Sequence, residues 1–179
     1  MIRASLSAFV LILSAVLPAA VAQGASCRQA VCAVGSLVRT YATPTDGYFA
    51  CPTRQLSEYT QIVLGLRSMH LQVTGKAPKN NPQTGEPVYE GETQAMLVAH
   101  RQEAGVRSFQ EAVKQCRTGT NGLAVRVVEY PSESRAMRVS DASGNQFWLS
   151  KTHADRGHED PSGQLGARLV RPTAPGIEE

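Results

Sequence analysis

The sequence predicts an α+β domain: a small twisted antiparallel sheet, or an open barrel, that carries a helical insertion and two disulfides. Three observations predict it. Four cysteines follow an apolar leader. The middle of the chain has apolar residues at helical spacing, and residues 123–150 alternate apolar and polar side chains between turn signals. We expect these parts to form one domain over residues 23–156, long enough to bury a core of its own.

Residues 1–22 have the features of a secretory signal peptide. Arg3 supplies a positive start, the run "AFVLILSAVLPAAVA" is apolar, and Ala20-Val21-Ala22 is a small-x-small cleavage signature. The run is too short and wrongly flanked for a membrane span, and no later segment is apolar enough to be one. We therefore expect a mature chain that starts near Gln23 and is periplasmic or secreted.

All four cysteines lie after this leader, at Cys27, Cys32, Cys51 and Cys116. In an oxidising compartment an even number indicates two disulfides. Three pairings are possible, and we favour Cys27–Cys32 together with Cys51–Cys116. The second would close a loop of about 65 residues, worth about 4 kcal/mol by chain entropy. A zinc site is disfavoured, because the chain has no CxxC pair.

Cys27 has an alternative role as a lipid anchor. Gly24-Ala25-Ser26 in front of it faintly resembles a bacterial lipoprotein box, but a large apolar residue belongs where Gly24 stands. Acylation would also leave three cysteines, an odd number that pairs poorly. We keep the anchor as the less favoured alternative.

The charge of the chain argues against a nucleic acid partner. Without Arg3 the mature chain has one basic residue fewer than the 18 Lys and Arg of the whole sequence, against 15 Asp and Glu, a net charge near +2. No run of Lys and Arg marks a phosphate-binding surface. Residues 157–179 hold Gly, Pro and charge with few apolar residues, so we expect a disordered tail there.

The first structured region is expected to hold two short strands and a helix. Residues 37–41 and 48–49 are rich in β-formers and flank the turn residues Pro44-Thr45-Asp46-Gly47. Thr53 or Ser57 is expected to cap the helix that follows, and residues 69–74 are its continuation or a strand. The apolar face of this helix consists of Leu56, Tyr59, Ile62, Val63, Leu66 and Met69.

A loop and two more helices follow. Residues 75–91 are rich in Gly, Pro and Asn, and a long internal loop is either a simple insertion or functional. The stretch "ETQAMLVAHRQEAG" has high helix propensity, with Gly105 as a stop signal. "VRSFQEAVKQC" predicts a shorter helix, since Ser108 and Glu111 form a capping box.

The last structured region is predicted to be a meander of three strands, at residues 123–130, 135–140 and 146–150. Side chains alternate along a strand, so one face holds the odd-numbered apolar residues and is the expected core. The core face consists of Leu123, Val125, Val127, Met137, Val139, Phe147 and Leu149, and the opposite face of Arg126, Val128, Tyr130, Arg138, Gln146 and Trp148.

The even-numbered face is the candidate ligand site. Arg126 and Arg138 lie near the single tryptophan, Trp148, and near Tyr130. An arginine over an indole ring is a cation–π pair, which would suit a shallow site for an anionic or sugar-like ligand. The alternative is that other elements cover this face, with Trp148 as packing and the arginine stems lying over it.

No motif indicates catalysis, a metal or a cofactor. The polar window "WLSKTHADRGHEDPSG" holds His153, Asp155, His158, Glu159 and Asp160, but it lies where the order is expected to end, and ligands need rigid support. GxSxG, HExxH and P-loop patterns are absent from the sequence. Glu90 and Glu92 are a carboxylate pair of the type glycosidases use, although close pairs are more often merely exposed.

The meander resembles the last strands of bacterial SH3-like barrels, through "VRVVEY", "RAMRVSDASG" and "NQFWLSKTHA" within residues 122–155. "SLVRTYATPTDGYFACPT" would supply the earlier strands. This resemblance implies a small barrel used for binding, often at the bacterial cell wall. The insertion from Leu56 to Cys116 departs from the family pattern, so no family site residues are transferred.

The function expected from these observations is a non-enzymatic binding module exported to a bacterial envelope, with an envelope protein or peptidoglycan as the partner. A second hypothesis is a periplasmic inhibitor or immunity-type protein that inserts the 75–91 loop into a partner. A third is a cell-wall hydrolase with unrecognised catalytic residues. The sequence leaves the oligomeric state open.

Overall fold

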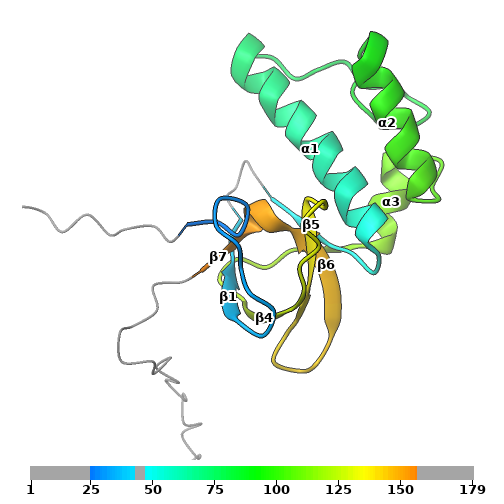
Figure 1. Ribbon diagram of the computed structural model, residues 1–179. Coiled ribbons are helices and arrows are strands. Elements are labelled where there is room, and N and C mark those ends of the chain that lie inside the picture. Colours follow the sequence, from blue (N-terminus) through cyan, green and yellow to red (C-terminus); the bar gives the residue numbers. More distant parts are fainter. Residues whose placement is uncertain (1–24, 43–46, 157–179) are drawn as a thin grey trace, which may run out of the picture.

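The protein has an α+β fold in which a curled antiparallel sheet carries three helices at one end (Figure 1). The computed structural model describes residues 25–42 and 47–156. The sheet consists of β6 (Gln146–Ser150), β5 (Ala136–Ser140), β4 (Ala124–Glu129), β1 (Leu37–Thr40) and β7 (Ala154–Asp155), in that spatial order. It is not closed into a barrel. The predicted fold class, a small antiparallel sheet with a helical insertion and two disulfides, is confirmed.

The helical insertion leaves the sheet region through β2 (Phe49–Ala50) and returns through β3 (Arg117–Thr118), which pair with each other. It contains α1 (Arg54–Thr74), α2 (Gly91–Glu103) and α3 (Phe109–Gln115). Cys51 directly follows β2, Cys116 directly precedes β3, and the two are bonded. This disulfide closes the base of the insertion. With Cys27–Cys32 also bonded, the favoured pairing is confirmed.

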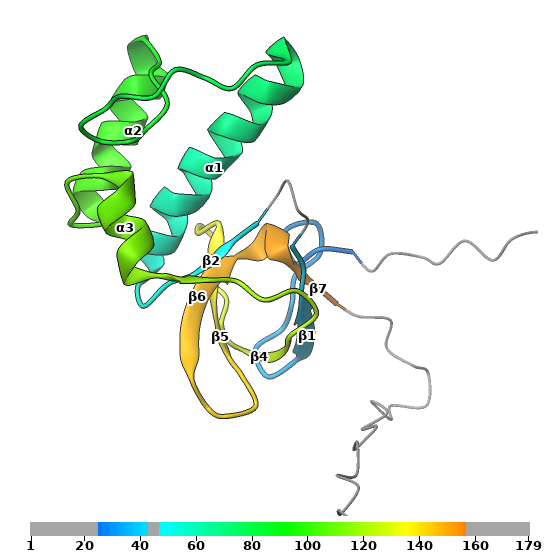
Figure 2. The ribbon, with the colours of Figure 1, turned by 180° about the vertical axis from the view of Figure 1, so that it is seen from behind.

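Two hydrophobic cores divide the molecule into two lobes. The β lobe is built around Cys27, Cys32, Val38, Tyr48, Ala50, Val125, Val127, Met137, Val139, Phe147, Leu149 and Ala154. The helical lobe is built around Cys51, Leu56, Tyr59, Ile62, Val63, Leu97, Val106, Phe109 and Ala112. The predicted odd-numbered core face is confirmed, with Leu123 packed at its margin. Figure 2 shows the helical lobe standing on one end of the sheet.

Helix α1 is longer than its apolar face predicts. Thr53 caps it, as its side-chain oxygen accepts the Leu56 N–H at 3.3 Å, and Gly75 ends it in the left-handed conformation. Residues 69–74 are therefore helix, and the strand alternative is wrong. Gly75 can adopt a φ of 69° without a side-chain penalty, so the chain turns there rather than earlier.

The two shorter helices match their sequence signals. Gly105 has a positive φ just after α2. The Ser108 hydroxyl accepts the Glu111 N–H at 3.1 Å, which is one half of the predicted capping box. In the other half, Glu111 accepts the backbone N–H of Arg107 at 2.9 Å, one residue before the cap. The charged side chain thus stabilises the helix start from a slightly displaced position.

The two early strands join different sheets. β1 pairs with β4 and β7, whereas β2 pairs with β3. The turn residues 43–46 between them lie outside the described residues. β3 and β7 are two-residue strands that have no local sequence signal. At the end of the predicted domain, Asp155 lies opposite Arg39, and the Arg156 N–H donates to the Ala25 carbonyl at 3.3 Å.

The lobes contact each other along the first half of α1. The Ser134 hydroxyl, in the turn between β4 and β5, donates to the Glu58 carboxylate at 2.5 Å. The Arg54 guanidinium lies 3.6 Å from the Glu133 carboxylate in the same turn. Beneath these contacts, Ala136 and Ser150 are buried. One end of the even-numbered face of the meander is therefore covered by α1, and the other end is open.

Candidate functional site

A β-bulge in β4 changes which residues face the ligand site predicted from the sequence. Val127 lies opposite Val139, but the next pair joins Glu129 to Arg138, so Val128 is the extra residue. After a bulge the side-chain alternation is shifted by one. Glu129 therefore lies on the outer face beside Arg138, and Tyr130 turns toward the core of the β lobe.

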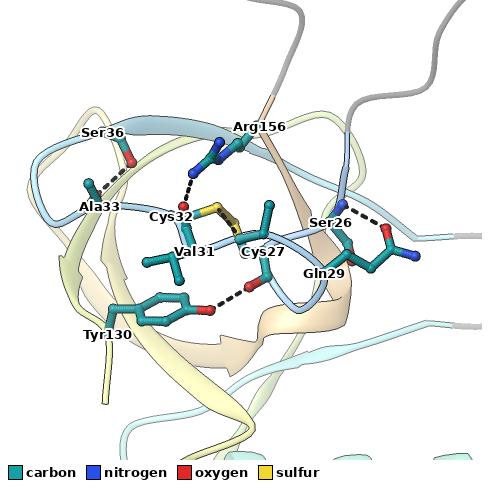
Figure 3. Close-up of a disulfide and its surroundings, with 10 residues drawn as sticks. Ser26, Cys27, Gln29, Val31, Cys32, Ala33, Ser36, Tyr130 and Arg156 are labelled. Carbon is teal, nitrogen blue, oxygen red and sulfur yellow. Dashed lines mark hydrogen bonds between the residues drawn. A yellow bond between two sulfur atoms is a disulfide. The ribbon is translucent and has the colours of Figure 1, made fainter. Parts of the chain in front are cut away.

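Tyr130 is consequently a structural residue, and its assignment to the ligand face is wrong. Its hydroxyl donates to the Cys27 carbonyl at 2.5 Å, and the ring packs against the β-lobe core. The Lys151 ammonium lies 3.7 Å from the centre of the ring. Figure 3 shows the tyrosine reaching the loop closed by Cys27–Cys32. It thus fixes the N-terminal loop on the sheet.

Arg138 and Trp148 do form the expected pair. They lie opposite each other on β5 and β6, and the Arg138 guanidinium is 5.9 Å from the centre of the indole ring. The same guanidinium lies 3.0 Å from the Glu129 carboxylate, with the two side chains 38% and 44% exposed. We call Glu129, Arg138 and Trp148 the Trp148 surface. Its cation is neutralised, which favours a neutral, hydrogen-bonding ligand over an anion.

Arg126 does not belong to this surface. Its guanidinium donates to the Gly35 carbonyl at 2.5 Å, in the segment before β1. It lies opposite Ser140, whereas Trp148 lies opposite Arg138. Of the four residues predicted for the ligand site, the structure therefore brings together Arg138 and Trp148. Glu129, which the strict alternation placed on the core side, completes the cluster.

The N-terminal disulfide is part of a closed structural unit. Cys27 and Cys32 are buried, and the Cys27 N–H donates to the Ala154 carbonyl at 2.7 Å. The Arg156 guanidinium donates to the Val31 carbonyl across the loop (Figure 3). The sulfur atom that a lipid anchor would need is bonded to Cys32 in this structure.

The helical lobe contains a buried carboxylate that sequence reasoning missed. Glu86 is 1% exposed; its Oε1 accepts the Tyr59 hydroxyl at 2.7 Å, and its Oε2 accepts an N–H of Arg101. Burial, and then the hydrogen bond to Glu86, raise the pKa of Tyr59. The network ties the segment before α2 to both α1 and α2. A carboxylate in a Gly/Pro-rich stretch carries no local sign of such burial.

The 75–91 segment is folded against its own helices. The Arg67 guanidinium donates to the Gly85 carbonyl at 2.5 Å and lies 4.9 Å from the centre of the Phe109 ring, and burial lowers its pKa. The Phe109 N–H donates to the Thr84 carbonyl at 2.7 Å, so the segment also meets the start of α3. Gly85, Glu86 and Pro87 are buried.

Only the first part of the polar window after β6 lies within the described residues. His153 is fully buried, with Nδ1 3.0 Å from the Tyr41 carbonyl oxygen and its ring stacked on Tyr48 at 5.5 Å. Burial raises the pKa of Asp155, against a smaller effect of His153. His158, Glu159 and Asp160 lie outside the described residues. Within residues 25–42 and 47–156, no group of three His, Cys, Asp or Glu could hold a metal ion.

Three further features bear on the choice between functions. Glu90 and Glu92 are both exposed at the start of α2. Among the helices of the described part of the chain, none is long and apolar enough to cross a membrane. Where α1, α2 and the end of β6 meet, a groove of about 300 Å³ opens between the lobes.

Comparison with known proteins does not assign a function to these residues. Comparison of the chain with protein-family models, with curated proteins and with solved structures finds no match. The functional argument therefore depends on the residues themselves, and the SH3-like resemblance remains a prediction.

Proposed function

We propose that the protein is an exported, non-enzymatic binding module of a bacterial envelope, and that the Trp148 surface contacts its ligand. The apolar leader and the two disulfides support export, because disulfides persist in oxidising compartments. The observation that carries the proposal is the stack of Arg138 on Trp148 beside Glu129 on a partly exposed sheet face.

The chemistry of this surface suits a glycan, such as the strands of peptidoglycan. An indole ring offers an apolar face for the C–H side of a sugar. The guanidinium and the carboxylate offer a hydrogen-bond donor and acceptors for hydroxyl groups at its edge. Arg138 and Glu129 neutralise each other, so this surface does not attract an anion. An anion would also be repelled by the Glu129 carboxylate, whereas a neutral sugar would not.

Co-sedimentation of the processed protein with purified peptidoglycan tests this proposal. We expect Trp148→Ala to lower the bound fraction at least fivefold. Glu129→Gln, which leaves the ring in place, should lower it less. Arg126→Gln is the matched control, because Arg126 lies on the same sheet but bonds to Gly35. Wild-type protein that stays in the supernatant, or a folded Trp148→Ala variant that sediments fully, contradicts the proposal.

The other two proposals from the sequence have less support. To enter a partner's active site, the 75–91 segment would have to leave α1 and α2 and expose the Glu86 carboxylate. For a hydrolase, the carboxylates considered from the sequence, Glu90 and Glu92, lie at the exposed start of α2 and not in a cleft described above. The Trp148 surface needs no rearrangement, so we rank it first.

A further inference from the structure

The groove between the lobes has an apolar floor. Its volume is about 300 Å³, at the small end of the range of about 300–1,000 Å³ for ligand pockets. Ile62, Leu66 and Met69 supply the floor from α1, and Met96 from α2. Met69 is 52% exposed. Methionine side chains adapt to the shape of an apolar ligand, so this floor suits an alkyl chain.

The rim of the groove is cationic. Arg28 and Arg135 line it from the β lobe, together with Ser150 and Thr152. In the described residues no carboxylate lies within 4.0 Å of either guanidinium. By contrast, Arg54, Arg101 and Arg138 each pair with a glutamate. Two arginines that no described carboxylate neutralises, beside an apolar floor, favour a negatively charged head group.

Glu58, the acidic residue of α1 near the groove, does not pair with Arg28 or Arg135. Glu58 lies one helical turn before Ile62, and its carboxylate accepts the Ser134 hydroxyl at 2.5 Å. Ser150, which is 3% exposed, and Thr152 also line the groove, and the Ser150 hydroxyl oxygen accepts the Thr152 N–H at 3.3 Å. Among the polar groups that line the groove, Arg28 and Arg135 can only donate hydrogen bonds, whereas Gln61, Ser150 and Thr152 can both donate and accept them.

Gly65 keeps the groove open. It lies inside α1, where glycine is about 1 kcal/mol less favourable than alanine, and it lines the groove. A Cβ built there would have no atom within 4 Å. No close packing and no positive φ requires glycine at this position, so helix stability alone would favour a larger residue. What the missing side chain provides is space beside Leu66 and Met69.

We propose that this groove binds a small amphipathic anion: a medium-chain carboxylate whose head group pairs with Arg28 and Arg135 and whose alkyl chain lies on the methionine floor. The small volume selects a single short chain over a two-chain lipid. The groove shares no lining residue with the Trp148 surface, so this inference does not depend on the proposed glycan binding.

Isothermal titration of the processed, disulfide-bonded protein with decanoate, below its micelle-forming concentration, tests the site. We expect decanoate to bind, acetate not to bind, and decyltrimethylammonium, which has the same chain and the opposite charge, to bind at least tenfold more weakly. Absence of decanoate binding at millimolar concentration, or equal binding of the cationic amphiphile, overturns the proposal.

Two variants separate a ligand site from a general effect on folding. Gly65→Leu fills the groove with a good helix former, so we expect at least tenfold weaker decanoate binding with an unchanged or higher melting temperature. The double change Arg28→Gln with Arg135→Gln should weaken binding at least tenfold, whereas Arg126→Gln should not. Wild-type affinity in folded Gly65→Leu protein, or in the double variant, overturns the assignment.

Discussion

The two lobes are held together in different ways. The β lobe depends on a backbone ladder of five strands and a hydrophobic core, and its disulfide spans only five positions of sequence. The helical lobe is closed by a disulfide that spans 65 positions and contains a buried ion pair between Glu86 and Arg101. The helical lobe therefore adds a long-range covalent link and a buried ion pair to its hydrophobic core, whereas the β lobe adds a strand ladder to its own.

Removal of the two disulfides, one at a time, should produce the largest difference in stability between the lobes. Chain entropy assigns about 4 kcal/mol to the 65-position loop and about 2 kcal/mol to the five-position loop. We therefore expect Cys51→Ala with Cys116→Ala to lower the free energy of unfolding by about twice as much as Cys27→Ala with Cys32→Ala. Urea titration followed by circular dichroism at 222 nm and by Trp148 fluorescence measures both. Equal losses would show that the lobes do not differ in this way.

Removal of the buried Glu86 carboxylate should have the next largest effect on stability. Glu86→Ala leaves the Arg101 guanidinium and the Tyr59 hydroxyl without their partner. Breaking a buried ion pair costs about 3–5 kcal/mol, and we expect about 3 kcal/mol because the Arg101 side chain is 18% exposed.

Glu133→Ala is the matched control for Glu86→Ala. It removes an exposed pair with Arg54 and should lower the free energy of unfolding much less than Glu86→Ala does. If the helical signal is lost at lower urea than the Trp148 signal in Glu86→Ala, the lobes unfold separately. Similar stability of the two variants would refute the role given to Glu86.

The smallest expected effect is a pH dependence in the β lobe. The Lys151 ammonium donates to the Pro131 carbonyl at 2.5 Å, and burial lowers the pKa of Lys151, against smaller effects of Glu133 and Glu58. The folded chain thus holds this proton less tightly than the unfolded chain. Stability should rise with pH between the lowered pKa and the ordinary value of 10.5.

The Lys151→Met variant isolates this effect. It lacks the titrating group, so the stability of wild type relative to the variant should increase from pH 7 toward pH 10.5. Chemical unfolding of both proteins across that range measures the difference. Parallel stability curves would mean that the Lys151 pKa is the same in the folded and unfolded chains.

What the sequence predicted well depends on local patterns. The three helices and the three-stranded meander follow from apolar spacing, capping residues and turns, and these act within a few residues of chain. The pairing of Cys51 with Cys116 was favoured among three that the cysteine count left open, and the structure contains it. The part of the β-lobe core that the meander supplies followed from the alternation of its side chains.

The features that the sequence did not predict depend on distant partners. β7 exists because β1 is beside it, and its two residues carry no pattern of their own. The bulge at Val128 moved Tyr130 inward and Glu129 outward, which strict alternation cannot anticipate. Glu86 is buried because Tyr59 and Arg101 meet it, so its role required the positions of two helices.

The base of the helical insertion has a consequence for how this chain tolerates change in length. The Cα atoms of Cys51 and Cys116 are 4.3 Å apart, and β2 and β3 run antiparallel into them. A short turn joining these two positions would therefore keep every strand in its place and order. For the same reason, a helical hairpin of another size should be accepted at this point, as long as it covers the part of the sheet around Ala136 and Ser150 that α1 covers here.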